Sequence, residues 1–399
     1  MNKRLVHLIV MLLIISMLAG CGASSPKQEA PKKNENNNVS NGTAAAETFF
    51  GIEPLPEPTK VRIAFFAGAH HANAFKVAEA KGWLKELNII PEYVSFVNGP
   101  AMMEAMNDWD MGTAGAPGAI SGMVGRGLKV LALASNDTML DLYVREDHPI
   151  YKSGKGHIPG YPEIYGKPED WKGTTWLLPM GTTMHYTLIS VLEAMGLSAD
   201  DVNIINMDVS SALNAFKAGQ GDGCGVWVAV SMAAARMGFK RVARIGDAGK
   251  IITTTIFANP EFLKKNREVA KKVLEIYLAT AYWGYQPQNR QEAADIFLKH
   301  CEDEGIKITL EDCLYAYEAC SQFSLEEQIA MAQKIVEDPK GKKKNMNEIE
   351  YLIIDTFDFF HSLGNYDDTQ RERVLDGLID TSVLIEIGQD YKAAGKKLP

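Results

Sequence analysis

Hydrophobic and polar positions along the chain alternate in two periods, which predict strands and helices. The apolar runs at Val61–Phe66 and Lys129–Ser135 are typical of buried strands, and Ala74–Leu87 has the spacing of a helix. Strands and helices take turns in this way over residues 61–135 and again over residues 174–257. This alternation predicts parallel sheets with helices on both faces.

The two alternating blocks are connected by two segments that cross between them. Asp141–Asp147 is predicted to be an extended crossing strand, and Ile251–Phe257 a strand that returns to the first block. We therefore predict an α/β fold of two lobes, with residues 59–143 and 251–399 in the first and residues 144–250 in the second. Because ligands bind at the carboxyl ends of strands in open α/β sheets, we expect a hinged cleft between the lobes.

Two further regions extend this plan. Tyr151–Asp170 is rich in Gly, Pro and Lys and is predicted to be a surface insertion. From Pro260 onward the pattern is almost entirely helical and predicts a helical C-terminal extension. Helices are expected at Arg267–Tyr285, Gln291–His300, Leu310–Ala319, Leu325–Val336 and Asn347–Leu363.

The N-terminal region has a different character. Lys3 and Arg4 precede an apolar run that is short for a bilayer span and ends in Leu18-Ala19-Gly20-Cys21. This order predicts a secretory signal over residues 1–20. The pattern resembles the lipobox of bacterial lipoproteins, which implies a lipid on Cys21. Residues 21–58 are rich in Ser, Asn, Lys, Pro and Ala and are predicted to be a disordered tether.

The net charge argues against one class of partner, and the cysteines leave a question of pairing open. The net charge of −9 argues against a nucleic-acid partner, which needs a basic surface. It leaves the sign of a small ligand open, since backbone N–H groups can hold an anion in an acidic protein. Cys301, Cys313 and Cys320 lie close together in sequence, but sequence alone does not pair them.

One turn carries the chemistry of an anion site. A predicted strand ends at Pro179-Met180-Gly181-Thr182-Thr183, where a helix begins that extends to Ala194. The free N–H groups of a first helical turn carry partial positive charge. Gly181 permits a close approach to the backbone, and Thr182 or Thr183 is a natural N-cap. The turn is therefore either an ordinary helix cap or a cradle for a sulfonate, carboxylate, phosphate or nitrate.

The sequence around this turn resembles a known family. Trp171–Leu188 is similar to the "DLKGKKIAVPKGS…H" region of substrate-binding proteins for aliphatic sulfonates, taurine, nitrate and thiamine precursors in ABC importers. The similarity continues in Gly196–Trp227, in Asn107–Ser135 and in Ala279–Phe297, and covers roughly residues 60–300. The insertion and the helical extension depart from the family pattern.

The resemblance implies a two-lobed, type II periplasmic-binding-protein-like fold whose cleft holds a small anion. Its partners would be an ABC permease and its ATPase, and the membrane through the lipid on Cys21. The protein would be an extracytoplasmic monomer without catalytic activity. By position, the cleft would be lined by Gly68, His70, His71, Asn98, Gly99, Gly115, Ala116, Gly181, Thr182, Thr183, His185 and Trp227, the last offering a broad apolar face.

Other interpretations remain beside this one. His70 and His71 with His185 could bind a transition metal, but no carboxylate or Cys stands near them in sequence, so no metal or cofactor is predicted. The ligand could be a thiamine pyrimidine precursor, and the protein could be a ligand sensor. An enzyme on the same fold is the third alternative, although no nucleophile elbow or Cys-rich iron motif is present.

Overall fold

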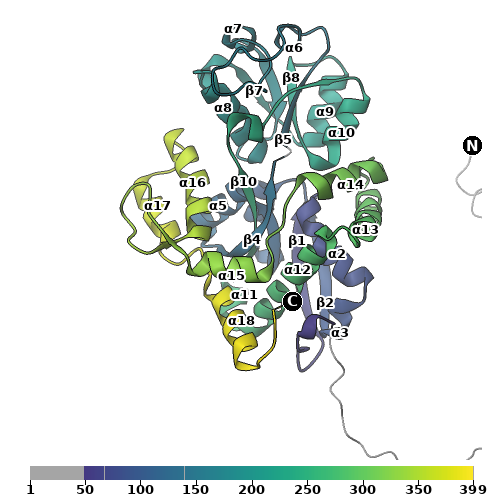
Figure 1. The fold of residues 1–399 in the computed structure, drawn as a ribbon, viewed down its shortest axis with the longest axis vertical. Helices are drawn as coiled ribbons and strands as arrows, with labels where there is room; N and C mark the ends of the chain where they lie inside the picture. The colour runs from purple at the N-terminus through teal and green to yellow at the C-terminus, as the bar shows by residue number, and fades with distance from the viewer. Residues whose placement is uncertain (1–48, 67, 139, 399) are drawn as a thin grey trace, which may run out of the picture. The chain divides into compact units, whose positions relative to one another are not determined.

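A computed structural model of the chain describes residues 49–66, 68–138 and 140–398. The predicted signal, Cys21 and the tether as far as residue 48 lie outside the described residues. Two five-stranded sheets organise the described part, one in each lobe (Figure 1).

The first sheet has the strand order β2-β1-β3-β10-β4. Strands β1, β2 and β3 run parallel, and β10 lies antiparallel between β3 and β4. The sheet is formed by β1 (Thr59–Phe66), β2 (Ile89–Phe96), β3 (Met111–Gly115), β4 (Lys129–Asp137) and β10 (Ile252–Ala258). The elements that complete this lobe before β4 are η2 (His70–Ala72), α2 (Asn73–Ala80), α3 (Trp83–Glu86), α4 (Gly99–Glu104), η3 (Met106–Asp108) and α5 (Ala116–Arg126).

The second sheet has the order β7-β6-β8-β5-β9, with β5 antiparallel to both of its neighbours. Its strands are β5 (Leu140–Val144), β6 (Thr175–Leu178), β7 (Asn203–Asn206), β8 (Gly223–Trp227) and β9 (Lys240–Arg244). Its helices are α6 (Pro149–Lys152), α7 (Pro168–Trp171), α8 (Thr183–Ala194), η4 (Ala199–Asp201), α9 (Val209–Lys217), α10 (Val228–Arg236) and η5 (Ile245–Ala248).

The lobe boundary expected at residue 143 is wrong by one strand. β5 belongs wholly to the second sheet, because it pairs with β8 and β9, so the chain crosses between Asp137 and Leu140. It returns between η5 and β10. Each sheet thus receives an antiparallel strand at a crossing, and the two crossings lie side by side (Figure 1).

The segment predicted as a surface insertion is anchored in the second lobe. It contains the end of α6 and most of α7, and Ile158 and Ile164 bury their side chains in the second hydrophobic core. Tyr151 stacks on Tyr165 with ring centroids 5.3 Å apart. Apolar residues spaced through a Gly- and Pro-rich segment therefore hold it against the lobe.

The C-terminal extension contacts both lobes. The elements after β10 are α11 (Pro260–Lys265), α12 (Arg267–Tyr285), α13 (Arg290–Asp303), α14 (Leu310–Ala319), α15 (Leu325–Gln333), β11 (Ile335–Val336), β12 (Met346–Asn347), α16 (Glu348–Ser362), α17 (Asp368–Leu375) and α18 (Ser382–Ala393). Phe357 of α16 lies in the core of the first lobe, whereas Phe359 and Phe360 lie in that of the second. The Phe359 ring centroid is 4.3 Å from that of Tyr186 in α8.

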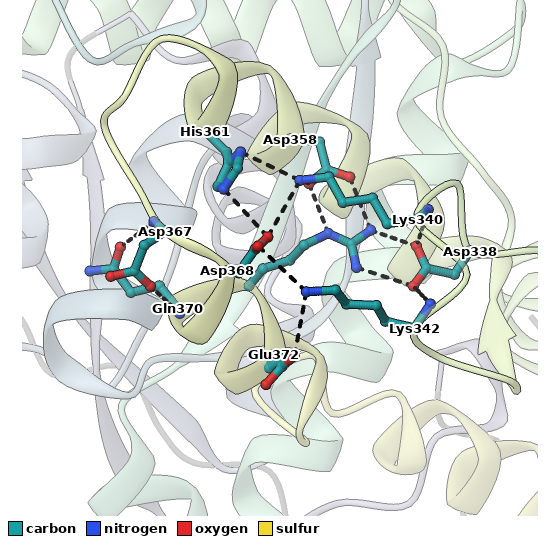
Figure 2. Close-up of polar contacts among 10 residues, drawn as sticks. Asp338, Lys340, Lys342, Asp358, His361, Asp367, Asp368, Gln370 and Glu372 are labelled. Atoms are coloured by element: carbon teal, nitrogen blue, oxygen red, sulfur yellow. Dashed lines mark hydrogen bonds and ion pairs between the residues drawn. The ribbon is translucent and has the colours of Figure 1, made fainter.

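A buried ion cluster holds the α16–α17 part of the extension together. Arg371 of α17 is fully buried and donates hydrogen bonds to Asp338, at 2.5 and 3.1 Å, and to Asp358, at 2.8 and 2.9 Å. Figure 2 shows Lys340 between Asp358 and Asp368 at the edge of this cluster. Because each buried charge has a counter-charge at hydrogen-bonding distance, the cluster fixes how α17 lies against α16.

The tether predicted to extend to residue 58 ends earlier. The chain packs on the first lobe from η1 (Phe49–Gly51) onward, and Ile52 and Leu55 are buried there. The Leu55 amide donates to the Leu87 carbonyl at 3.1 Å, and Asn88 donates to the Leu55 carbonyl at 2.7 Å. Burial of the apolar side chains Ile52 and Leu55 stabilises this stretch on the lobe. The polar composition of the residues before them led to the prediction of a longer tether.

Two further findings concern cysteines and membranes. In the described ranges, Cys224, Cys301, Cys313 and Cys320 are all buried free thiols, so the three clustered cysteines do not pair with one another. Among these same residues, every helix is too short or too polar to span a bilayer.

Candidate functional site: the contact between the strand ends of the two sheets

The carboxyl ends of strands from both sheets face one another. β1 ends at Phe66 and β3 at Gly115 in the first lobe, while β8 ends at Trp227 in the second. The rings of Phe66 and Trp227 meet with centroids 5.5 Å apart. The strand ends and helix starts of the two lobes therefore form a common site, as expected for open α/β sheets.

The lobes are in close contact at this site. A Cβ atom added to Gly115 would lie 2.5 Å from Cγ2 of Thr183, the first residue of α8. Two cavities of about 20 Å³ each remain between the lobes, and each has room for about one water molecule. A larger solute can enter only when the lobes part or side chains move.

A wider hollow of about 410 Å³ lies beside the narrow cavities. The first lobe contributes Phe96 and Val97, and the second contributes Asp208, Ser210 and Trp227. Trp227 lines both the hollow and the narrow cavities, so it separates the outer space from the inner site.

Eight of the twelve predicted cleft residues line the two narrow cavities. They are Gly68, His70, His71, Gly99, Gly115, Thr182, Thr183 and Trp227. The other four, Asn98, Ala116, Gly181 and His185, do not line these two cavities. Asn98 caps α4 by accepting from the Ala101 amide at 3.0 Å, and Ala116 is buried at the start of α5.

Gly181 and His185 form a hydrogen bond with each other next to these cavities. The Gly181 amide donates to Nδ1 of His185 at 3.4 Å, and Gly181 has the positive φ of 68° that favours glycine. The His185 ring packs on Phe360 of α16, with centroids 5.9 Å apart. Burial lowers the pKa of His185, so this side chain is held as a neutral acceptor.

The hydroxyl of Thr182 is occupied by the local backbone. It accepts from the Met184 amide at 3.2 Å and donates to the Pro179 carbonyl at 2.7 Å. Thr182 is thus the N-cap of α8, one of the two residues predicted for that position. Thr183, whose side chain lines both cavities, is the residue of this turn that faces the opposite lobe.

A polar network closes the deep end of the site. Nε2 of His70 lies 2.9 Å from Oδ1 of Asp137 and 3.3 Å from Oγ of Ser135. Ser135 donates to Asp137 at 3.2 Å and lies 2.7 Å from the hydroxyl of Thr254 on β10. The strands next to the two crossings, β4 and β10, therefore supply the polar side chains at the bottom of the site, which we call its floor.

Electrostatics at this floor are set by burial and by the two histidines. Burial and the neighbouring His70 lower the pKa of His71 to about 3, so His71 is neutral. Burial alone would raise the pKa of Asp137, but the charge of His70 and its hydrogen bond outweigh burial and hold that pKa below its ordinary value. Among the described residues, the lining contains no Lys or Arg, so Asp137 and histidines are its ionisable groups.

The fold brings together three potential metal ligands that are far apart in the sequence. His70, Asp137 and Cys320 are brought together in space, and one potential ligand atom from each lies within 4.8 Å of the others. His185, which was grouped with His70 and His71, is not part of this set. Phe66, Asp137, Leu140 and Thr254 also line the site and were missed. Of these four residues, only Asp137 could have been suspected from the sequence, because it is a carboxylate that closely follows the apolar run 129–135.

Comparisons with known proteins identify one family and several proteins that this chain resembles. Residues 164–289 match the family described as NMT1/THI5 like. A candidate ABC transporter periplasmic binding protein of Brachyspira hyodysenteriae is 26% identical over 56% of this chain and 64% of its own length, so the match spans under two thirds of that relative. The taurine-binding periplasmic protein of Escherichia coli is 25% identical over 64% of this chain and 77% of its own.

The fold comparison covers more of the chain. The periplasmic nitrate-binding protein NrtA of Synechocystis PCC 6803 superposes with a TM-score of 0.64 at 13% identity, covering 86% of this chain and 91% of that one. At this identity the likeness concerns the fold. The predicted resemblance and the predicted fold class are both confirmed: the chain has the periplasmic-binding-protein fold, and residues 164–289 carry its match to the NMT1/THI5 like family.

Proposed function

We propose that this chain is the extracytoplasmic substrate-binding component of an ABC importer, and that it captures a small sulfonate-, nitrate- or carboxylate-like anion between its lobes. The observation that carries the proposal is the meeting of strand ends and helix starts from both sheets at Gly115 and Thr183. The names of the taurine-binding and nitrate-binding relatives support the ligand class. An ABC permease and its ATPase would receive the solute.

The first turn of α8 is the proposed anion contact. Its N-terminus faces the opposite lobe at Thr183, and the dipole of this 12-residue helix favours negative charge there. The lining contributes no Lys or Arg among the described residues. The anion would therefore be bound by backbone N–H groups, the Thr183 hydroxyl and His70. The Phe66 and Trp227 rings would cover an apolar part of the solute.

Capture would proceed by hinge closure about the two crossings. The cavities of about 20 Å³ correspond to the closed arrangement, in which a solute could not enter from outside. Opening would also strain the contacts that the C-terminal extension makes with the second lobe. Arg236 of α10 pairs with Asp312 of α14, with Nη2 and Oδ2 2.6 Å apart, and Arg244 of β9 lies 3.4 Å from the Tyr315 hydroxyl. The extension would thus bias the protein toward the closed state.

The proposal includes a lipid anchor on Cys21, supported by the small-residue motif after an apolar run. The test is metabolic labelling with a fatty-acid analogue. Wild-type protein should be labelled and membrane-bound, and the Cys21→Ala variant unlabelled. Equal labelling of both proteins would contradict a lipid anchor on Cys21.

The ligand class is tested by a thermal-shift screen of the full chain against taurine, a longer alkanesulfonate, nitrate, a small carboxylate and a neutral pyrimidine. If the site binds anions, one or more of the four anionic or sulfonate compounds should raise the melting temperature of the protein. Stabilisation by the pyrimidine alone would contradict the proposed class. Recovery of the bound solute chemically unchanged is expected of a binding protein, and its conversion would indicate an enzyme. Loss of solute uptake on deleting the gene would separate an importer subunit from a sensor.

A further inference from the structure

Three side chains from distant parts of the sequence form a cluster at the floor of the cleft. His70 follows β1, Asp137 ends β4, and Cys320 is the C-cap of α14. One ligand atom of each, an imidazole nitrogen, a carboxylate oxygen and the thiol sulfur, lies within 4.8 Å of the other two. The side chains of His70 and Asp137 are 8% and 6% exposed, and Cys320 is buried, so bulk water has little access to the cluster.

We propose that His70, Asp137 and Cys320 form a binding site for a transition-metal ion of the zinc type. Imidazole nitrogen, carboxylate oxygen and thiolate sulfur are the three donor types that proteins use for zinc. The proposal does not depend on which solute the cleft takes.

The spacing of the donors fits a single ion after small side-chain rotations. Tetrahedral zinc with bonds of about 2.0–2.3 Å places its ligand atoms roughly 3.3–3.6 Å apart. Nε2 of His70 and Oδ1 of Asp137 are 2.9 Å apart, slightly closer than this, and the set as a whole stays within 4.8 Å. An ion at the centre would take the place of the direct contact between His70 and Asp137.

The surroundings resemble an outer shell of supporting groups. Ser135 donates to Asp137 at 3.2 Å and so can orient the carboxylate toward an ion. Nδ1 of His71 is buried and has no hydrogen-bond partner among the described residues, and its ring centroid is 5.3 Å from that of His70.

The fourth coordination position would face the narrow cavity. His70 and Asp137 both line that cavity, whose volume of about 20 Å³ accommodates one water molecule. Three protein ligands with one position open to a water or a solute is a recognised zinc arrangement. A metal there would place positive charge in a lining that has no Lys or Arg among the described residues.

The experiment uses the full chain, freed of metal with a chelator and dialysed, and titrated with Zn²⁺ alone by calorimetry. Co²⁺ serves as a spectroscopic probe, because a thiolate bound to Co²⁺ gives a charge-transfer band in the near ultraviolet. The wild-type chain should bind one equivalent of Zn²⁺ and show this band. Cys320→Ser should abolish the band and weaken Zn²⁺ binding by at least about tenfold, and His70→Gln should weaken it similarly.

Cys313→Ser is the matched control, since Cys313 is also a buried free thiol of α14 but lies outside the cluster. It should keep the band and the affinity of the wild type. The proposal is overturned if the wild-type chain binds no Zn²⁺ and shows no thiolate band, a result that does not depend on how any variant folds. It is equally overturned if Cys320→Ser and Cys313→Ser bind Zn²⁺ as the wild type does.

Discussion

Gly115 and Thr183 lie against each other across the cleft, with so little space between them that a Cβ atom on Gly115 would come within 2.5 Å of the Thr183 methyl group. Gly115 itself has a φ of −59°, which any residue can adopt. The absence of a side chain at this position therefore serves the approach of the two lobes and not the local backbone.

Gly115→Ala should hold the lobes apart while leaving each lobe folded. Small-angle scattering should give a larger radius of gyration than for the wild type. Thr183→Ser removes the methyl group that the new side chain would meet, so the double variant should recover the wild-type value. Gly125→Ala is the control, because Gly125 lies in α5 and an added Cβ there has nothing within 4 Å. This variant should have the radius of gyration of the wild type. An unchanged radius for Gly115→Ala would show that the contact yields.

Phe359→Ala should weaken the link between the extension and the second lobe. The ring packs against Tyr186 in the second core, and removing a buried phenyl ring costs about 3–5 kcal/mol. Phe357→Ala removes a ring of the same helix from the first core and should cost a similar amount. Chemical denaturation measures both losses. Only Phe359→Ala should also favour the open arrangement in scattering; if both variants or neither did, the extension would not act as a brace.

Arg371 should make stability fall with acid. Its hydrogen bonds hold the pKa of Asp338 well below the ordinary carboxyl value, so the ionised form is favoured in the folded state. A depressed folded pKa stabilises the protein above the unfolded pKa of about 3.9, and this stabilisation is lost as the pH falls from there toward the folded pKa. Asp338→Asn should therefore flatten the decline in unfolding free energy below about pH 4.

Arg371→Met tests the same cluster at neutral pH. It leaves Asp338 and Asp358 without their buried counter-charge and should cost about 3–5 kcal/mol. The exposed pair Lys299–Asp303 is the control, because Lys299→Met should change stability by less than about 1 kcal/mol. Equal effects of the two substitutions in urea denaturation would contradict the importance of burial.

The N-terminal edge of the folded region is tested by two truncations. A chain that begins at Lys60 lacks Ile52 and Leu55, whose burial contributes roughly 1.5–3 kcal/mol each. It should unfold at a lower denaturant concentration than a chain that begins at Phe49. Coincident unfolding curves would restore the original expectation that the tether reaches residue 58.

Local patterns predicted the elements well where a helix carries its own signals. The bounds expected for Thr183–Ala194, Arg267–Tyr285 and Leu310–Ala319 are those of α8, α12 and α14. The first begins at a Thr N-cap, and α14 begins with a capping box at Thr309. Such signals act over a few residues and can be read without knowing the fold.

The errors concern relations between distant residues. β5 was assigned to the first lobe because its partners β8 and β9 come much later in the chain. The cluster of His70, Asp137 and Cys320 was missed for the same reason, since the fold brings together three residues with no common motif. The helices α17 and α18 were not foreseen. α17 has a strongly polar sequence, and it is attached through the buried charge of Arg371 together with the buried side chains of Val374 and Leu375.

The central claim is that a small anion binds at the start of α8, between the lobes. The most direct measurement is calorimetric titration of the full chain with the solute identified by screening, compared between Thr183→Val and Thr183→Ser. Val keeps the shape of Thr183 and removes its hydroxyl, whereas Ser keeps the hydroxyl. The account predicts that Val weakens binding by about 1–3 kcal/mol and that Ser binds nearly as the wild type does. Wild-type affinity in both variants would place the solute elsewhere and contradict the account.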